Sequence, residues 1–446
     1  MMGAFLLELA WTGRGLERRV LLQESAGVIE RMEPLLDQPT PREAVVCSGL
    51  TIPGLCNAHS HCFHRALRGR TEDPSAADFW SWRQRMYQLA HSLTPDSYHR
   101  LALAVFAEMV LAGITTVGEF HYLHHQRGGQ PYSHGDMEAA LISAADEAGI
   151  RLTLLDTCYL RPGFQGDSLE GPAARFSDGS ARAWVDRVNR IEPSSRLIVG
   201  AAAHSVRALD EDSLSVVAGW AEERRAPLHL HLSEQTAENE ACLTATGKTP
   251  TALLWGLGLL GPQTTAVHAI HLTPEDVRLL GESGTAICVC PTTERELADG
   301  VCRALELSSA GSPLCLGTDS NSLVDLFEEA RAVELDQRLV TKRRGLHSAG
   351  DLLKAATAGG ARALGWDAGE LRVGAKADFV SLDLESTRLA GPGLNDLISR
   401  VVFAAAPSDV TTVVVDGQLL VQDGIHLRLG TAGSLLSQAL SQVESA

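Results

Sequence analysis

The chain has 446 residues, 45% hydrophobic and 21% charged, a composition typical of a folded enzyme and unlike that of disordered or fibrous proteins. Its formal net charge of -17 argues against nucleic acid as a partner, because the phosphates would be repelled. No apolar stretch approaches the ~20 residues that span a bilayer, and the first residues show no basic region before an apolar run. We therefore expect a cytoplasmic protein that contacts no membrane.

Nine cysteines are scattered along the chain without a C-x-x-C pair. Most of them lie in apolar, strand-like segments, so we expect buried, reduced thiols. Cys288 and Cys290 share a strand face, but no second ligand pair accompanies them, and we predict no zinc site there.

From residue 50 onward, apolar strand-like runs alternate with amphipathic segments. The eight strand-like runs are residues 50–60, 115–120, 151–160, 195–206, 227–234, 265–272, 285–291 and 313–320. The helix-like segments between them include residues 95–114, 135–150, 210–226 and 274–284. Eight alternating units predict an α/β fold with a closed parallel sheet, a (β/α)8 or TIM-like barrel. A doubly wound open sheet is the alternative, but it normally has a glycine-rich turn after its first strand, which is missing here.

The two ends of the chain have a different pattern. Residues 1–50 and 370–430 contain short β-like runs bounded by turn residues, including a hairpin signal at Asp416 and Gly417. We expect these ends to pair into one small β-sandwich domain beside a barrel formed by residues 51–369. Residues 431–446 are expected to form a C-terminal helix.

Ionisable side chains gather near the ends of six of the eight strand-like runs. They are His59 and His61; Glu119, His121 and Tyr122; His204 and Arg207; His229, His231 and Glu234; His268 and His271; and Asp319. Residues i and i+2 of a strand point to the same side, so His59 and His61 can converge on one point. A barrel brings its strand ends to one face, where active sites of this fold lie.

Three or four of these side chains converging on Zn²⁺ make chemical sense. Neutral imidazole is a good zinc donor, and a carboxylate can complete the ligand set while leaving a position for water. Bound zinc lowers the pKa of that water to about 7, which supplies hydroxide at neutral pH. A single histidine in an apolar strand is more often a packed core residue, so it is the joint pattern that favours a metal site.

Four motifs resemble those of the metal-dependent amidohydrolase superfamily. They are N-A-H-S-H at residues 57–61, H-L-H-L-S-E at 229–234, V-H-A-I-H at 267–271 and G-T-D-S at 317–320. The resemblance covers nearly the whole chain and implies a (β/α)8 barrel that carries one or two metal ions. It implies the metal ligands His59, His61, His231 and Asp319. It also implies that Glu234 shuttles protons and that His268 lies beside the bound water.

The same resemblance bears on the number of metal ions. No lysine lies near the end of the fourth run, where two-metal relatives often carry a modified bridging lysine, so we expect one ion per chain. Zn²⁺ suits the ligands, and Fe or Mn can occupy the same set. His229 shares a strand face with His231 and spacing alone does not choose between them, but His229 would lie one layer deeper and is expected to pack.

The rest of the substrate would meet positively charged side chains. Arg207 follows the fourth run, Tyr122 follows the second, and Arg83 lies in a long loop after the first. Two guanidinium groups and a phenol suit a small dicarboxylate, because arginine binds carboxylates through two parallel hydrogen bonds. The alternative for that loop is that Trp80 and Trp82 pack into the barrel mouth while Arg83 and Arg85 are merely solvated.

Within the superfamily, these segments are similar to the formimidoylglutamate deiminase subgroup. The matching segments are N-A-H-S-H-C-F-H-R-A-L, F-W-S-W-R-Q-R-M-Y, E-F-H-Y-L-H-H and A-H-S-V-R-A-L. The resemblance implies hydrolysis of N-formimino-L-glutamate, a step of histidine degradation, to N-formyl-L-glutamate and ammonia. Arg83, Tyr122 and Arg207 would hold the two carboxylates, and His204 would help position them.

One position departs from that subgroup. His64 stands where some members carry glutamine, which changes a substrate contact and leaves the reaction class intact. Glu294 is expected to line the pocket wall, and relatives of this architecture are often dimers, so we expect a homodimer. The main alternative is a deaminase or chlorohydrolase acting on a purine, pyrimidine or triazine ring. A metal-free structural relative would lack ligands, whereas the set is complete here.

Overall fold

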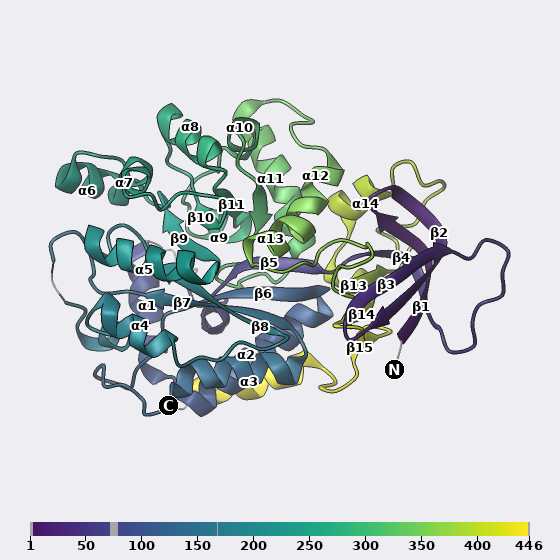
Figure 1. Ribbon diagram of the computed structural model, residues 1–446, viewed down its shortest axis with the longest axis horizontal. Coiled ribbons are helices and arrows are strands. Elements are labelled where there is room, and N and C mark those ends of the chain that lie inside the picture. Colours follow the sequence, from purple (N-terminus) through teal and green to yellow (C-terminus); the bar gives the residue numbers. More distant parts are fainter. Residues whose placement is uncertain (1–2, 72–78, 167, 445–446) are drawn as a thin grey trace.

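The computed structural model describes residues 3–71, 79–166 and 168–444. Two sheets organise the chain, a parallel one at the centre and a mixed one built from both chain ends (Figure 1). Helices surround the parallel sheet, while the mixed sheet lies to one side of it (Figure 1).

The parallel sheet closes into a barrel. Its strands are β5 (Leu55–Ser60), β6 (Ile114–His121), β7 (Arg151–Cys158), β8 (Leu197–Ala203), β9 (Leu228–Leu232), β10 (Thr264–His268), β11 (Ala286–Val289) and β12 (Leu314–Leu316), paired in chain order. The His61 N–H donates to the Asp319 carbonyl and the Asp319 N–H donates to the His59 carbonyl, both at 2.9 Å. These bonds join the eighth unit to the first, so the predicted (β/α)8 barrel is confirmed.

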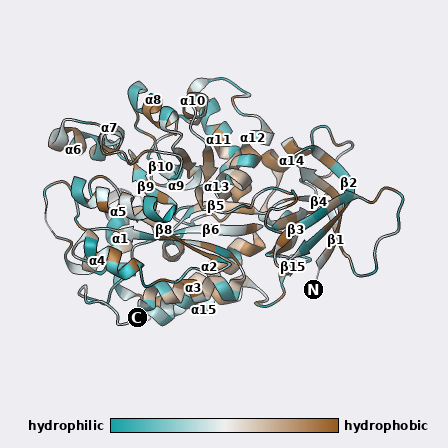
Figure 2. Cartoon of the chain, in the orientation of Figure 1, coloured by the Kyte–Doolittle hydropathy of each residue, from teal (hydrophilic) through white to brown (hydrophobic). Residues whose placement is uncertain are grey.

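The barrel strands are covered on both sides. Every residue of β6 and β7 is buried, as expected for parallel strands with helices outside and packed side chains inside. On the outer helices α4 and α5, hydrophilic and hydrophobic residues are mixed, as Figure 2 shows. This mixture fits helices that bury one face against the sheet and expose the other to water.

Local signals in the sequence set several helix starts. Thr94 accepts a hydrogen bond from the Ser97 N–H at the start of α2, and Thr273 does the same with Asp276 at the start of α8. In both cases a proline follows the capping threonine, where its missing N–H costs nothing. The helices are α1 (Phe79–Ser92), α2 (Pro95–Leu111), α3 (Asp136–Ala148), α4 (Ala181–Val188), α5 (Glu211–Arg224), α6 (Thr236–Thr246), α7 (Pro250–Gly256), α8 (Pro274–Ser283), α9 (Pro291–Glu296), α10 (Ala304–Ala310), α11 (Leu326–Thr341), α12 (Ala349–Lys354), α13 (Gly360–Ala363), α14 (Leu397–Ala404) and α15 (Ala432–Glu444).

The second sheet confirms that both chain ends form one small β domain. Its eight strands are, in spatial order, β16 (Ile425–His426), β15 (Gln418–Gln422), β14 (Val410–Val415), β13 (Phe379–Leu382), β4 (Val45–Pro53), β1 (Gly3–Thr12), β2 (Gly15–Ser25) and β3 (Val28–Pro34). The N-terminal strand β4 pairs with the C-terminal strand β13, which joins the two ends. The Phe5 and Phe379 rings, on strands separated by β4, lie 5.1 Å apart, so the continuous sheet curls around its own core.

Two segments differ from the sequence interpretation. The first strand-like run splits at Gly54, where β4 of the small sheet ends and β5 of the barrel begins. A side chain at Gly54 would meet Thr115, which keeps this crossing tight. The segment that carries Arg83 was expected to be a loop, but it is the helix α1.

A buried ion cluster connects the small domain to the barrel. Arg151, the first residue of β7, donates to Asp378 and to Asp416, each at 2.6 Å, and its guanidinium stacks on Trp366. Arg151 and Asp378 are at most 1% exposed. The N-terminal end of β7 is therefore held by the small domain, which leaves the C-terminal strand ends to form a site.

The last helix, α15, packs against α2 outside the barrel (Figure 1). Among the residues that the structure describes, no helix combines the length and the apolar composition that crossing a membrane requires.

Candidate active site

One cavity at the C-terminal ends of the barrel strands gathers nearly all the predicted site residues. His61, His64, Arg83, Tyr122, His204, Arg207, His231, Glu234, His268 and Asp319 line it. His59 is fully buried at the cavity floor, beside Asp319 and His231. Residues from six strands and from α1 thus meet at one point, as the strand-end pattern predicted.

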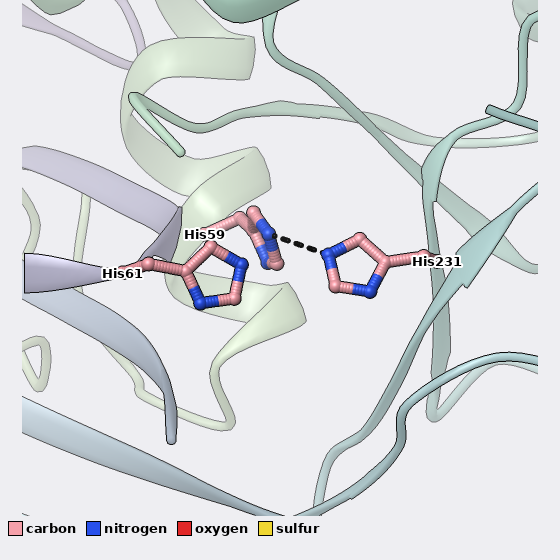
Figure 3. Close-up of side chains that lie close together, drawn as sticks. All are labelled: His59, His61 and His231. Carbon is pink, nitrogen blue, oxygen red and sulfur yellow. Dashed lines mark hydrogen bonds between the residues drawn. The ribbon is translucent and has the colours of Figure 1, made fainter. Parts of the chain in front are cut away.

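Three imidazoles converge at the bottom of this cavity (Figure 3). His59 and His61 come from the end of β5 and His231 from β9, and their ligand-type nitrogens all lie within 4.8 Å of one another. The two closest nitrogens, Nε2 of His59 and Nε2 of His231, are 3.2 Å apart. The Asp319 Oδ1 atom lies 3.5 Å from Nε2 of both His59 and His61.

Backbone carbonyls decide which ring nitrogens face the centre. The Nδ1–H of His61 donates to the Phe120 carbonyl at 2.9 Å, and the Nδ1–H of His231 donates to the His204 carbonyl at 3.0 Å. A carbonyl can only accept, so each neutral ring presents a bare Nε2 lone pair. Such second contacts are the usual way in which proteins orient metal-binding histidines.

The charges of this group fit a divalent cation. Burial lowers the pKa of His59, His61 and His231, so the rings are neutral donors. Burial acts to raise the pKa of Asp319, but the adjacent His59 imidazole and the nearby His268 hold it well below the ordinary value. Among the described residues, no carbonyl fixes the proton of neutral His59: on Nε2 it makes the 3.2 Å contact with His231 a hydrogen bond, and on Nδ1 it leaves both Nε2 atoms free to bind one cation. The residues therefore fit a metal ion held by three nitrogens and one carboxylate.

Two further acidic residues hold His268 beside this group. Its Nε2 lies 3.7 Å from Asp319 Oδ2 and 3.9 Å from Glu234 Oε1, and its Nδ1 lies 3.3 Å from Glu294 Oε1. Burial acts to lower the pKa of His268, yet these carboxylates raise it to about 10. Burial also raises the pKa of Glu234 above its ordinary value. A buried carboxyl group next to a charged imidazole is suited to proton transfer.

The backbone at this end of the barrel is strained. His268 and Asp319 have φ angles of 70° and 47°, in the left-handed region that residues other than glycine rarely adopt. Conformations of this kind cost about 1–3 kcal/mol and cluster at functional sites, because the surrounding contacts must hold them in place.

Side-chain hydrogen bonds fasten the first and last strand ends together. The Asn57 amide donates to Thr318 Oγ1 at 2.7 Å, and the Asn321 amide donates to the His61 carbonyl at 3.1 Å. Gly317 allows the close approach, because a Cβ atom there would lie 2.7 Å from His59 Cβ. Sequence reasoning missed this network, although Asn57 and Thr318 lie within the very motifs that it singled out.

The outer part of the cavity is cationic and aromatic. Arg83 donates from Nη2 to the Tyr159 hydroxyl at 3.1 Å and from Nε to the Tyr87 hydroxyl at 2.7 Å. Tyr122 and His64 pair through the hydroxyl and Nε2 at 2.8 Å. Tyr159 also lines the cavity and was not predicted. The sequence offered one indication of it, an aromatic residue with a hydroxyl group directly after an apolar strand.

Some histidines and cysteines near the strand ends lie outside the cavity. His229 shares the strand face of His231 but does not line the cavity, and its Nε2–H donates to the Ala363 carbonyl at 2.9 Å. Glu294, expected on the pocket wall, contacts His268 instead. All nine cysteines are free and buried, and the Sγ atoms of Cys288 and Cys290 lie 4.0 Å apart.

A second cluster of buried histidines lies at the C-terminal end of β6, and we call it the β6 cluster. It comprises His121, His124, His125, Glu138, Asp156, Asp178 and Arg187. Glu138 Oε1 lies 2.7 Å from His124 Nδ1 and 3.3 Å from His121 Nε2. Arg187 donates to Glu138 at 2.9 Å and to Asp156 at 2.8 Å. A fixed cation, the Arg187 guanidinium, is thus already paired with these carboxylates.

Comparison with known proteins agrees with this architecture. The sequence profile of the amidohydrolase family matches residues 50–420. The chain belongs to the amidohydrolase family. As a member of it, the protein is a hydrolase, and the buried histidine group described above has the donors to hold a metal ion.

Individual relatives point to more than one activity. Formimidoylglutamate deiminase of Pseudomonas aeruginosa is 33% identical over 440 residues, 95% of this chain and 96% of that protein. 5′-Deoxyadenosine deaminase of Methanoregula boonei is 33% identical over 383 residues, 84% of this chain and 80% of that protein. The crystal structure of an amidohydrolase from Brucella melitensis superimposes with a TM-score of 0.92 at 32% identity, covering 99% of this chain and 100% of that one.

Proposed function

We propose that the protein hydrolyses N-formimino-L-glutamate to N-formyl-L-glutamate and ammonia, using one zinc ion. Two observations of different kinds support this proposal. The first is the similarity to the deiminase of P. aeruginosa over nearly the full length of both chains. The second, which carries the choice of substrate, is that Arg83 and Arg207 line the same cavity as the metal-binding histidines.

The two arginines favour an anionic substrate over a neutral ring. A ligand that fills the cavity displaces water from both guanidinium groups. If the ligand offers them no negative charge, burying each unpaired guanidinium costs several kcal/mol of binding free energy. A dicarboxylate supplies the negative charge that the guanidinium groups need, and carboxylate oxygens accept strong, charge-assisted hydrogen bonds from arginine. A purine nucleoside or a triazine carries no comparable negative charge.

Zinc is favoured by the donor set. His59, His61 and His231 offer three neutral nitrogens and Asp319 one carboxylate oxygen, which is a common ligand set for zinc that retains an open position. Fe or Mn can bind the same residues. When bound, the metal ion supplies Lewis acidity that makes water a better nucleophile at neutral pH.

The residues of the chain account for the proton transfers. Water adds to the formimino carbon, and Glu234 accepts the proton that the water releases. Glu234 then delivers a proton to the nitrogen that leaves as ammonia, while the carbon keeps the oxygen as a formyl group. The raised pKa of Glu234 suits both roles, because it makes the carboxylate a better proton acceptor than an ordinary glutamate. His268 donates a hydrogen bond to the developing oxyanion. Asp319 accepts the second proton of the water and passes it on, so that the nitrogen gains both protons and leaves as ammonia.

An ammonia-release assay on the purified, zinc-loaded protein tests the proposal. We expect turnover of N-formimino-L-glutamate and at least 10²-fold lower kcat/KM for 5′-deoxyadenosine, adenosine, guanine and cytosine, since those rings leave the arginines unpaired. Faster release of ammonia from any of these ring substrates would replace the proposal with the alternative of a nucleobase or nucleoside deaminase.

A further inference from the structure

Tyr159, the residue directly after β7, joins the two arginines of the cavity. Its side chain is 2% exposed, and its hydroxyl oxygen accepts a hydrogen bond from Arg83 Nη2 at 3.1 Å. Burial acts to raise the pKa of the phenol, but Arg207 and Arg83 together bring it below the ordinary value near 10, with a hydrogen bond from Arg207 contributing. One phenol oxygen therefore meets both guanidinium groups.

The ring of Tyr159 is held firmly enough to fix that oxygen. Its centroid lies 3.9 Å from that of His204 and 5.8 Å from that of Phe176, with the Phe176 ring nearly parallel. Because Arg83 and Arg207 both lie beside this one oxygen and line the same cavity, their guanidinium groups face one small region of it. One carboxylate group has two oxygens and can accept hydrogen bonds from both guanidinium groups in that region.

Tyr87 provides an internal comparison. Its hydroxyl accepts from Nε of the same Arg83 at 2.7 Å, but Tyr87 lines a neighbouring depression and not the catalytic cavity. Tyr87 thus contacts Arg83, and also the Tyr159 hydroxyl, from outside the cavity, whereas Tyr159 meets Arg83 from inside it.

We propose that Tyr159 is a specificity-determining residue whose phenol, with Arg83 and Arg207, forms a single binding position for one carboxylate of the ligand. The O–H group donates to that carboxylate alongside the two arginines. This inference rests on the proposed function, because it assigns a role within recognition of the same dicarboxylate.

Binding of glutarate, a five-carbon dicarboxylate without a hydrolysable nitrogen, tests the inference by calorimetry on the metal-loaded protein. Tyr159→Phe keeps the ring and removes the donor, so we expect roughly tenfold to hundredfold weaker binding, the effect of losing a hydrogen bond to a charged group. Tyr87→Phe is the matched control. Tyr87 is partly exposed, so water can replace its hydroxyl as the acceptor for Arg83 Nε. We therefore expect glutarate binding to weaken less than about threefold.

A kinetic measurement separates recognition from a structural effect. With N-formimino-L-glutamate, Tyr159→Phe should raise KM by a factor similar to the loss in glutarate binding while kcat changes little. Equal losses for Tyr159→Phe and Tyr87→Phe would overturn the inference, because both would then act only through Arg83.

A double-mutant cycle tests independently whether Tyr159 and Arg207 bind the same carboxylate. Arg207→Gln combined with Tyr159→Phe should weaken glutarate binding by less than the product of the single losses, since both residues contact one carboxylate. Additive losses would overturn the single carboxylate position. Wild-type protein that binds no glutarate would overturn the proposed dicarboxylate function itself, whereas glutarate binding that Tyr159→Phe leaves unchanged would overturn only the role of Tyr159.

Discussion

The barrel centre and the β6 cluster each bring three metal-competent side chains within 4.8 Å of one another, and all of them are buried. At the barrel centre the nearest fixed charge is negative, the Asp319 carboxylate, and two backbone carbonyls turn bare nitrogens toward the middle. In the β6 cluster the middle already holds the guanidinium of Arg187, which contacts Glu138, Asp156 and Asp178.

This difference shows that histidine and carboxylate proximity alone does not define a metal site. A divalent cation placed beside Glu138 would lie within a few ångströms of a permanent positive charge, and that repulsion is strong in a buried position. His124 is also committed, since its Nε2–H donates to the Thr157 carbonyl and nearby carboxylates raise its pKa despite burial and Arg187. The β6 cluster is thus an ion-pair network that supports the loop carrying Tyr122.

The largest expected effect comes from removing the carboxylate at the barrel centre. Asp319→Asn should lower kcat/KM by about 10²–10⁴-fold and reduce bound metal, with little change in the free energy of unfolding of the metal-free protein. Metal content by mass spectrometry, steady-state kinetics and urea unfolding check these three expectations.

Asp156→Asn is the matched control in the β6 cluster. It weakens the contact with Arg187 at 2.8 Å and the bond from Trp184 Nε1, also 2.8 Å, so we expect lower stability with metal content unchanged. If Asp156→Asn loses metal and Asp319→Asn keeps it, the assignment of the two clusters is reversed.

The next effect is on stability alone. Arg187→Met leaves Glu138, Asp156 and Asp178 buried without their common partner, and breaking such a group typically costs about 3–5 kcal/mol. Urea unfolding measures this loss, and the bound metal per chain should stay the same as in the wild type. A variant as stable as the wild type would show that Arg187 is not what holds the cluster.

A smaller, pH-dependent effect follows from the same contacts. Burial raises the pKa of Glu138, but Arg187 and the two histidines bring it well below the ordinary value of 4.5. A depressed carboxyl pKa stabilises the fold above pH 4.5, and this contribution is lost as the pH falls from 4.5 through the folded-state pKa. The stability difference between wild type and Arg187→Met should therefore shrink below pH 4.5, as thermal unfolding across pH 3–7 can show. A difference that stays constant over this range would contradict the role of Glu138.

The barrel could be predicted because its signals are local and repeated. Eight apolar runs separated by amphipathic segments indicate the fold, and the i, i+2 spacing of His59 and His61 places both on one side of a strand. The cavity residues followed from their positions at strand ends, since the barrel brings these ends together wherever they lie in the sequence.

The remaining features depend on contacts that no local pattern encodes. Arg187 meets residues 49 and 31 positions away, and nothing in its own segment distinguishes it from a surface arginine on α4. Tyr159 follows a run that reads as core, and its meeting with Arg83, 76 residues away, depends on α1, which was mistaken for a loop.

An anomalous diffraction map recorded at the zinc edge, from crystals of the protein grown with zinc, tests the central claim most directly. The account predicts one peak about 2.0–2.2 Å from Nε2 of His59, His61 and His231 and from a carboxylate oxygen of Asp319, and none between His121, His124 and Glu138. A peak in the β6 cluster, or no peak at the barrel centre, would contradict it.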